Sequence, residues 1–271
     1  MNKLIQRDMF RSTITFFSIL LLTSAALAQV PNDNASNSAY SDGWQTGDNG
    51  GTGFGAWTLT GPTNTSQGGF FIGNSKNNGD DDGNGDGDIN TTGDKAWGLY
   101  ANSGQTASAV RSFSSALSVG QSFSLRMDNG WIDSGGTVGF GLQNASNTNR
   151  FEFYFVGGAS KYQRNDSGGV QNTTLDFTDG GLTIVFTLTG TNTYTATVTA
   201  YYDSGTSPQT DTFSGTLLNS GAIEKLRVFN YNAGSGGAHD AFFNSIAVPE
   251  PAALSLLALS GMLLRRRGRR T

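Results

Sequence analysis

Apolar and polar residues alternate with a period of two along much of the chain. Phe151, Phe153 and Phe155 share one face of an extended segment, for example, and Glu152 and Tyr154 share the other. In two later runs threonines fill the polar face. Such alternation predicts strands with one buried and one solvent face. The clearest runs are residues 123–127, 138–142, 151–155, 182–188 and 194–200.

Turn-forming tripeptides separate these runs. Asp-Asn-Gly, Ser-Gly-Gly and Asp-Gly-Gly occur between them, and such residues favour tight hairpins. After the first 28 residues no segment shows the 3.6-residue period of an amphipathic helix. Short strands joined by turns predict an all-β fold, an antiparallel β-sandwich rather than a parallel α/β sheet. Weaker strand signals lie at residues 56–60, 69–72, 96–101, 109–113, 223–232 and 241–248.

The N-terminus has the pattern of a secretory signal peptide. Three basic residues within the first eleven precede an apolar stretch at 14–22, and Ala26 and Ala28 then give the small-x-small cleavage pattern. This predicts export by the Sec translocon and cleavage by signal peptidase after Ala28. The alternative is an N-terminal membrane anchor, for which the apolar stretch is short.

The C-terminus has the pattern of a second targeting signal. Val248, Pro249, Glu250 and Pro251 precede an apolar run at 252–264 and a basic end. This order resembles the sorting signal of PEP-CTERM proteins. The resemblance implies that an exosortase-like membrane transpeptidase recognises and removes the tail. Basic residues would hold that end in the cytoplasm. They are Arg265, Arg266, Arg267, Arg269 and Arg270.

The apolar run of the tail has only 13 residues, roughly 20 Å of helix. A bilayer core of about 30 Å needs near 20 residues, so an interfacial helix is the alternative to a short transmembrane helix. We therefore expect a signal peptide at 1–28, a β-sandwich domain at 29–247 and a sorting signal at 248–271. Residues 29–55 are expected to form an irregular arm, and one helix is expected in each terminal segment.

Charge limits the partners of the sandwich domain. The whole chain has a net charge of −4. Residues 29–247 contain nine Lys and Arg against nineteen Asp and Glu, which gives about −10. A nucleic-acid partner would need the opposite sign, so none is expected. The chain has no cysteine, and stability must therefore come from the core.

An acidic, glycine-rich segment near residue 85 resembles the calcium loop of EF-hand and dockerin modules. Oxygen ligands at alternate positions converge on the ion in such loops, and a glycine permits the sharp turn. The acidic residue that closes the loop comes one position late here, as Asp94. The alternative is a solvated acidic loop. The candidate calcium ligands are Asp82, Asn84, Asp86, Asp88, Asn90 and Asp94.

Three segments of the domain resemble exported PEP-CTERM domains with a concanavalin-like or laminin-G-like jelly roll. They are Gly98–Ser103, Phe123–Gly130 and Val138–Leu142, and the final run Asp240–Val248 is similar to the closing strand of such sandwiches. The resemblance implies a fold and transfers no catalytic residue.

The sequence offers few candidate catalytic residues. His239 is the only histidine, and Glu152 and Glu224 are the only glutamates of the domain. Retaining glycoside hydrolysis needs two carboxyl groups about 5 to 5.5 Å apart. Glu152 lacks the acidic residue two positions on that concanavalin-like glycosidases place on the same strand face. We therefore expect a domain that is not an enzyme, with no catalytic residue to name.

A sugar site is one alternative. Trp131 lies beside a turn with Asn129 and Asp133, and an exposed aromatic ring beside amide and carboxylate groups can stack on a sugar ring and bind its hydroxyls. Packing of the tryptophan in the core is the competing interpretation.

The sequence as a whole favours an exported cell-surface or extracellular-matrix protein with a structural or interaction role. It would be held briefly in the inner membrane, processed by an exosortase-type system, and then secreted or displayed at the cell surface. A lectin-like module that binds exopolysaccharide is the alternative, and a polysaccharide-active hydrolase is a more distant one.

Overall fold

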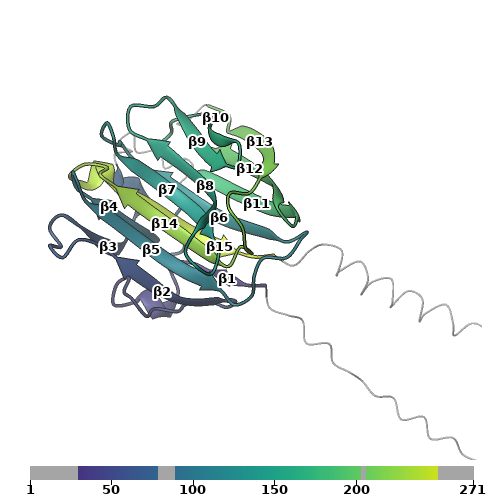
Figure 1. The fold of residues 1–271 in the computed structure, drawn as a ribbon. Coiled ribbons are helices and arrows are strands. Elements are labelled where there is room, and N and C mark those ends of the chain that lie inside the picture. The colour runs from purple at the N-terminus through teal and green to yellow at the C-terminus, as the bar shows by residue number, and fades with distance from the viewer. Residues whose placement is uncertain (1–29, 79–88, 203–205, 250–271) are drawn as a thin grey trace, which may run out of the picture.

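The computed structural model describes residues 30–78, 89–202 and 206–249 of the chain. Its strands form two antiparallel sheets that pack face to face as a β-sandwich (Figure 1). Within the described residues one sheet, sheet A, has eight strands and the other, sheet B, has seven. The predicted all-β antiparallel sandwich is thus confirmed. The two predicted terminal helices fall outside the described residues.

The order of the strands differs from their order along the chain in both sheets, because the chain passes from one sheet to the other between some consecutive strands. From edge to edge, sheet A contains β13 (Gln209–Thr216), β12 (Thr193–Ala200), β11 (Leu182–Gly190), β6 (Ser122–Asn129), β15 (Ala241–Ala247), β4 (Ala96–Ala101) and β3 (Gly68–Gly73), with β1 (Asn32–Asp33) paired to β15. Sheet B contains β10 (Gly169–Asp176), β9 (Lys161–Asp166), β8 (Asn149–Val156), β7 (Thr137–Gln143), β14 (Lys225–Tyr231), β5 (Thr106–Phe113) and β2 (Phe54–Thr60). In the parts of the chain described, the only helices are short 3-10 turns: η1 (Ser38–Tyr40), η2 (Ser75–Asn78) and η3 (Gly237–His239).

The core lies between the sheets and is built from the apolar positions of the alternating runs. All five strong runs bury those positions. Aromatic rings from both layers touch across the core: Phe151 of sheet B lies 5.2 Å from Phe186 and 4.9 Å from Tyr194 of sheet A, measured between ring centroids. Alternation therefore leaves the intervening side chains of β8 on the solvent face of sheet B.

Besides the two-residue β1, three strands are absent from the sequence prediction: β9, β10 and β13. Their residues are polar at most positions, and β10 and β13 are the edge strands of their sheets. An edge strand buries little side-chain surface, so its sequence needs few apolar residues. Few apolar side chains of these strands are buried, and Tyr162 of β9 and Leu175 of β10 are two of them.

The segment before β2 is largely irregular in backbone and packs onto the sandwich. It buries Tyr40 and Trp44, and the Trp44 ring meets Trp57 edge to face with centroids 5.1 Å apart. Asp33 forms a fully buried ion pair with Arg111 of β5. These contacts fix the N-terminal segment against sheet B.

Candidate functional site

The solvent face of sheet B has a hollow of about 510 Å³ over its central strands. Its walls include Glu152 and Tyr154 of β8 on one side, and Arg227 and Phe229 of β14 on the other. Strand β7 lies between them, as Figure 1 shows for the three neighbouring strands. We call this surface the glycine trough.

The register of the strands explains the hollow. Gly141 of β7 lies opposite both Glu152 and Arg227, and Gly139 lies opposite both Tyr154 and Phe229. Glycine carries no side chain, so β7 leaves the floor low between two walls. The walls stand two strand spacings apart, about 9 to 10 Å. Two glycines at alternate positions of a central strand therefore leave no side chain between the two walls.

The two floor positions differ in how much space they offer. A Cβ added at Gly139 would lie only 2.2 Å from the Phe153 carbonyl oxygen, so this position requires glycine. A Cβ at Gly141 would lie 3.3 Å from the Asn149 amide oxygen and farther from everything else. A Cβ at position 141 would thus meet no backbone atom closer than 3.5 Å, provided that the Asn149 amide shifts by a few tenths of an ångström, and it would lie between Glu152 and Arg227.

Glu152 presents an oriented hydrogen-bond acceptor. The Asn149 amide donates to one carboxylate oxygen, and the Asn165 amide of β9 donates to the other at 2.8 Å. An ionised carboxylate can accept about four hydrogen bonds, so further acceptor capacity is left for a ligand. Burial, and the negative charge of Glu152, raise the pKa of Tyr154. The Tyr154 hydroxyl therefore stays a neutral donor at ordinary pH.

Arg227 presents donors from the opposite wall. Its Nε donates to the Ser108 hydroxyl of β5 at 3.0 Å, and its guanidinium carbon lies 4.7 Å from the centroid of the Phe229 ring. Burial lowers the pKa of Arg227, while the charge of Glu152 acts in the opposite direction. With Nε engaged, the terminal guanidinium nitrogens are the donors that remain for a ligand.

Of the predicted sugar-binding residues, Trp131 is on the surface and Asn129 is not. Trp131 is 64% exposed, above a small pocket of about 260 Å³ that Phe155 and Phe177 also line. Asn129 is fully buried and accepts a hydrogen bond from Tyr162. The Asp133 side chain is half exposed and lies 4.0 Å from His239. The structure therefore does not present the three side chains as one surface.

Most of the predicted calcium ligands lie outside the described residues, as Asp82, Asn84, Asp86 and Asp88 do. Asn90, in contrast, is described: its amide oxygen accepts from the Ser75 backbone N–H at 2.9 Å, and its amide donates to Asn74. Asp94 is exposed, with a φ of 56°. Within residues 30–78, 89–202 and 206–249 no three acidic or histidine side chains gather as a metal site.

The predicted processing sites lie almost wholly outside the described residues, the signal cleavage residues Ala26 and Ala28 and the five tail arginines among them. Val248 and Pro249 are described, and the Val248 N–H donates to the Pro31 carbonyl at 2.9 Å. Glu250 and Pro251 are not. No helix in the described part of the chain has the length and apolar character to cross a membrane.

Comparison with known proteins finds no matching family model and no matching curated sequence. Solved structures are similar at a TM-score of 0.38. One is a glycoside hydrolase family protein from Mycobacterium thermorestibile, at 16% identity over 58% of this chain and 77% of that one. Another is arcelin-5, a lectin-like defence protein from Phaseolus vulgaris, at 8% identity over 71% and 98%. A third is the β-glucanase of Bacillus licheniformis, at 13% identity over 76% and 96%.

The expectation that the domain is not an enzyme is corrected by this comparison. Glycoside hydrolases and β-glucanases stand beside lectins among the similar structures. The expected sandwich agrees with the two antiparallel sheets of the described residues, whereas no family model supports the PEP-CTERM tail.

Sequence reasoning found one wall of the trough and missed the other. The alternation in β8 places Glu152 and Tyr154 together on the solvent face. Arg227 and Phe229 lie on β14, and only the antiparallel pairing of β14 with β7 brings them opposite. The one available signal was the pair of glycines that takes the place of polar side chains on the solvent-facing side of the run at 138–142.

Proposed function

We propose that the protein binds polysaccharide through the glycine trough. The observation that carries the proposal is the pairing of an acceptor wall, Glu152, with a donor wall, Arg227, across a floor without side chains. Sugar hydroxyls both donate and accept hydrogen bonds, so a hydroxyl-rich ligand can satisfy both walls at once.

The aromatic residues of the trough add an apolar contribution. Tyr154 and Phe229 face each other across Gly139, and Tyr231 continues the β14 wall with 46% of its surface exposed. Aromatic side chains give large contact areas at a binding surface, and a tyrosine adds a polar tip. Binding sites generally combine such surfaces with a few placed polar groups. A trough open at the surface suits a chain of sugars.

We further propose that the protein meets its polysaccharide outside the cytoplasm, secreted or at the cell surface. The support is the sequence of the two ends: a signal-peptide pattern before Ala28 and a Pro-Glu-Pro motif, apolar run and arginines after Val248. Processing of that tail by an exosortase-like enzyme belongs to the same proposal.

Binding is tested with a glycan array that contains neutral and acidic polysaccharides, probed with the mature domain and with two variants that each remove one charge. Glu152→Gln weakens the acceptor wall, and Arg227→Met removes the donors. We expect each variant to lose about ten- to hundredfold in affinity, because hydrogen bonds to charged groups contribute about 1.5–3 kcal/mol. Lys161→Met, at an exposed surface pair of β9, is the matched control.

The same samples distinguish binding from hydrolysis. Reducing ends are measured after the bound polysaccharide is incubated with wild type and with Glu152→Gln. Release by wild type alone would make the trough an active site with Glu152 as its carboxyl group. Retention of full affinity by both trough variants would refute the proposed binding surface.

A further inference from the structure

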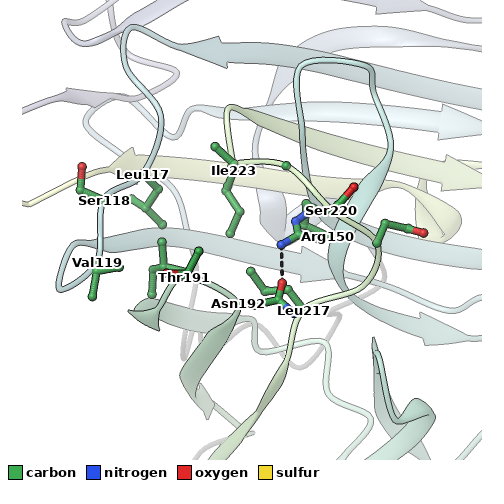
Figure 2. Close-up of a pocket in the computed structure, with 13 residues that line it drawn as sticks. Leu117, Ser118, Val119, Arg150, Thr191, Asn192, Leu217, Ser220 and Ile223 are labelled. Atoms are coloured by element: carbon green, nitrogen blue, oxygen red, sulfur yellow. Dashed lines mark hydrogen bonds between the residues drawn. The ribbon is translucent and has the colours of Figure 1, made fainter.

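A second pocket opens at one end of the sandwich, away from the glycine trough. Its volume is about 710 Å³. The lining is mainly apolar and comes from loops next to β6, β11 and β14, and Figure 2 shows Leu117, Leu217 and Ile223 around it. The side chain of Val119 at the rim is exposed. Such a volume and lining are typical of sites for small organic ligands.

The one charged residue among those that line this pocket is Arg150 of β8. Arg150 is 2% exposed. Its terminal nitrogens donate to the Leu218 carbonyl and to the Asn192 side chain, the second of which Figure 2 marks with a dashed line. Its Nε–H has no partner among the described residues. No carboxylate within the described residues forms an ion pair with it.

The other fully buried arginine shows what complete pairing looks like in this chain. Arg111 forms an ion pair with Asp33, donates from Nε to the Gly55 carbonyl, and donates from Nη2 to Gly50 and Asn49. A buried charge is costly unless it is paired and hydrogen-bonded. The charge of Arg111 is balanced inside the protein, whereas that of Arg150 is not.

We propose that this pocket binds a small monocarboxylate with an apolar tail, the carboxylate against the Arg150 guanidinium and the tail along the leucines. The anion supplies the missing counter-charge, and a guanidinium–carboxylate pair is a strong, oriented contact. Burial lowers the pKa of Arg150, and a bound carboxylate acts against this shift. The site is independent of the trough. A register shift beside Asn149 breaks the alternation of β8, so that Arg150 is buried and lines the end pocket, while Glu152 lines the trough.

The probe is decanoate, and decanol, which has the same chain length and no charge, is the control ligand. Each is titrated into the mature domain, and decanoate is kept below the concentration at which it forms micelles. Binding is followed by calorimetry and by backbone amide shifts. We expect decanoate to bind, with shifts at Leu188, Leu217 and Ile223, and decanol to bind at least tenfold more weakly. Equal binding of the two, or no decanoate binding, overturns the proposal.

Two variants locate the site. Ala222→Trp places a large ring at an exposed position of the lining and is expected to abolish decanoate binding. Arg150→Met keeps an unbranched apolar side chain and removes the guanidinium, so decanoate affinity should fall to that of decanol. If Arg150→Met does not fold, the proposed site is tested by Ala222→Trp and by the comparison of decanoate with decanol. Decanoate binding that survives in Ala222→Trp places the ligand elsewhere and refutes the site.

Gly141→Val is the control for independence, because it fills the trough and leaves the end pocket untouched. This variant should bind decanoate as wild type does. A loss of decanoate affinity here would mean that the ligand occupies the trough, which also contradicts the proposed pocket.

Discussion

Asp33 and Arg111 form a buried ion pair whose side chains are both inaccessible to solvent. Removing one partner of such a pair leaves an uncompensated charge, which typically costs about 3–5 kcal/mol. We therefore expect Asp33→Ala to lower the free energy of unfolding by this amount in a urea titration. Asp176→Ala removes one partner of the exposed pair with Lys161 and should cost under about 1 kcal/mol. Equal losses in the free energy of unfolding of the two variants would contradict a larger contribution from the buried pair.

Asp240 gives the stability a dependence on pH. Burial raises the pKa of Asp240 from 3.8 to about 7. Between these values the folded protein holds a proton that the unfolded chain has released, so the contribution of this group to stability falls as pH rises from about 4 to about 7. Asp240→Asn removes the titration. We expect the melting temperature of this variant, relative to wild type, to be higher at pH 8 than at pH 5. A difference that does not change with pH would contradict the shift.

At the scale of the elements, the sequence predicts strands well where one face is buried. The apolar positions of β6, β7, β8, β11 and β12 are fixed by the core between the sheets, and period-two alternation reports them directly. The strands β9, β10 and β13 lie at or next to sheet edges, where burial is slight and the pattern is weak. Pairing between strands far apart in sequence, such as β7 with β14, leaves no local pattern. One wall of the trough is therefore predictable from sequence and its counterpart is not.

The acidic loop between β3 and β4 stays a prediction, since residues 79–88 lie outside the described structure. We expect millimolar calcium to raise the melting temperature, with an affinity in the range of about 10⁻⁴ to 10⁻³ M that is common for extracellular sites. Asp82→Ala and Asp86→Ala should each remove the rise, whereas Asp211→Ala on β13 should keep it. A calorimetric titration without heat would refute calcium binding.

At the scale of the whole molecule, the proposed location requires both ends to be removed. We expect the secreted native protein to begin at Gln29 and to lack the arginines from Arg265 onward, because both apolar segments are proposed to be targeting signals that are cleaved off. Intact-mass analysis of the culture medium measures both cut sites together with any attached group. A protein of full length recovered from the cytoplasm would contradict export.

Polysaccharide binding in the glycine trough is the central claim, and filling the trough floor tests it most directly. A Cβ at position 141 would lie 3.5 Å from the nearest backbone atom, and valine favours strands, so Gly141→Val should keep the fold. Thr195→Val, which puts the same side chain on the partly exposed face of sheet A, is its control. The measurement is a calorimetric titration of wild type and both variants with the best oligosaccharide from the array. The account predicts unchanged affinity in Thr195→Val and a loss of at least about tenfold in Gly141→Val, while wild-type affinity in a folded Gly141→Val would contradict it.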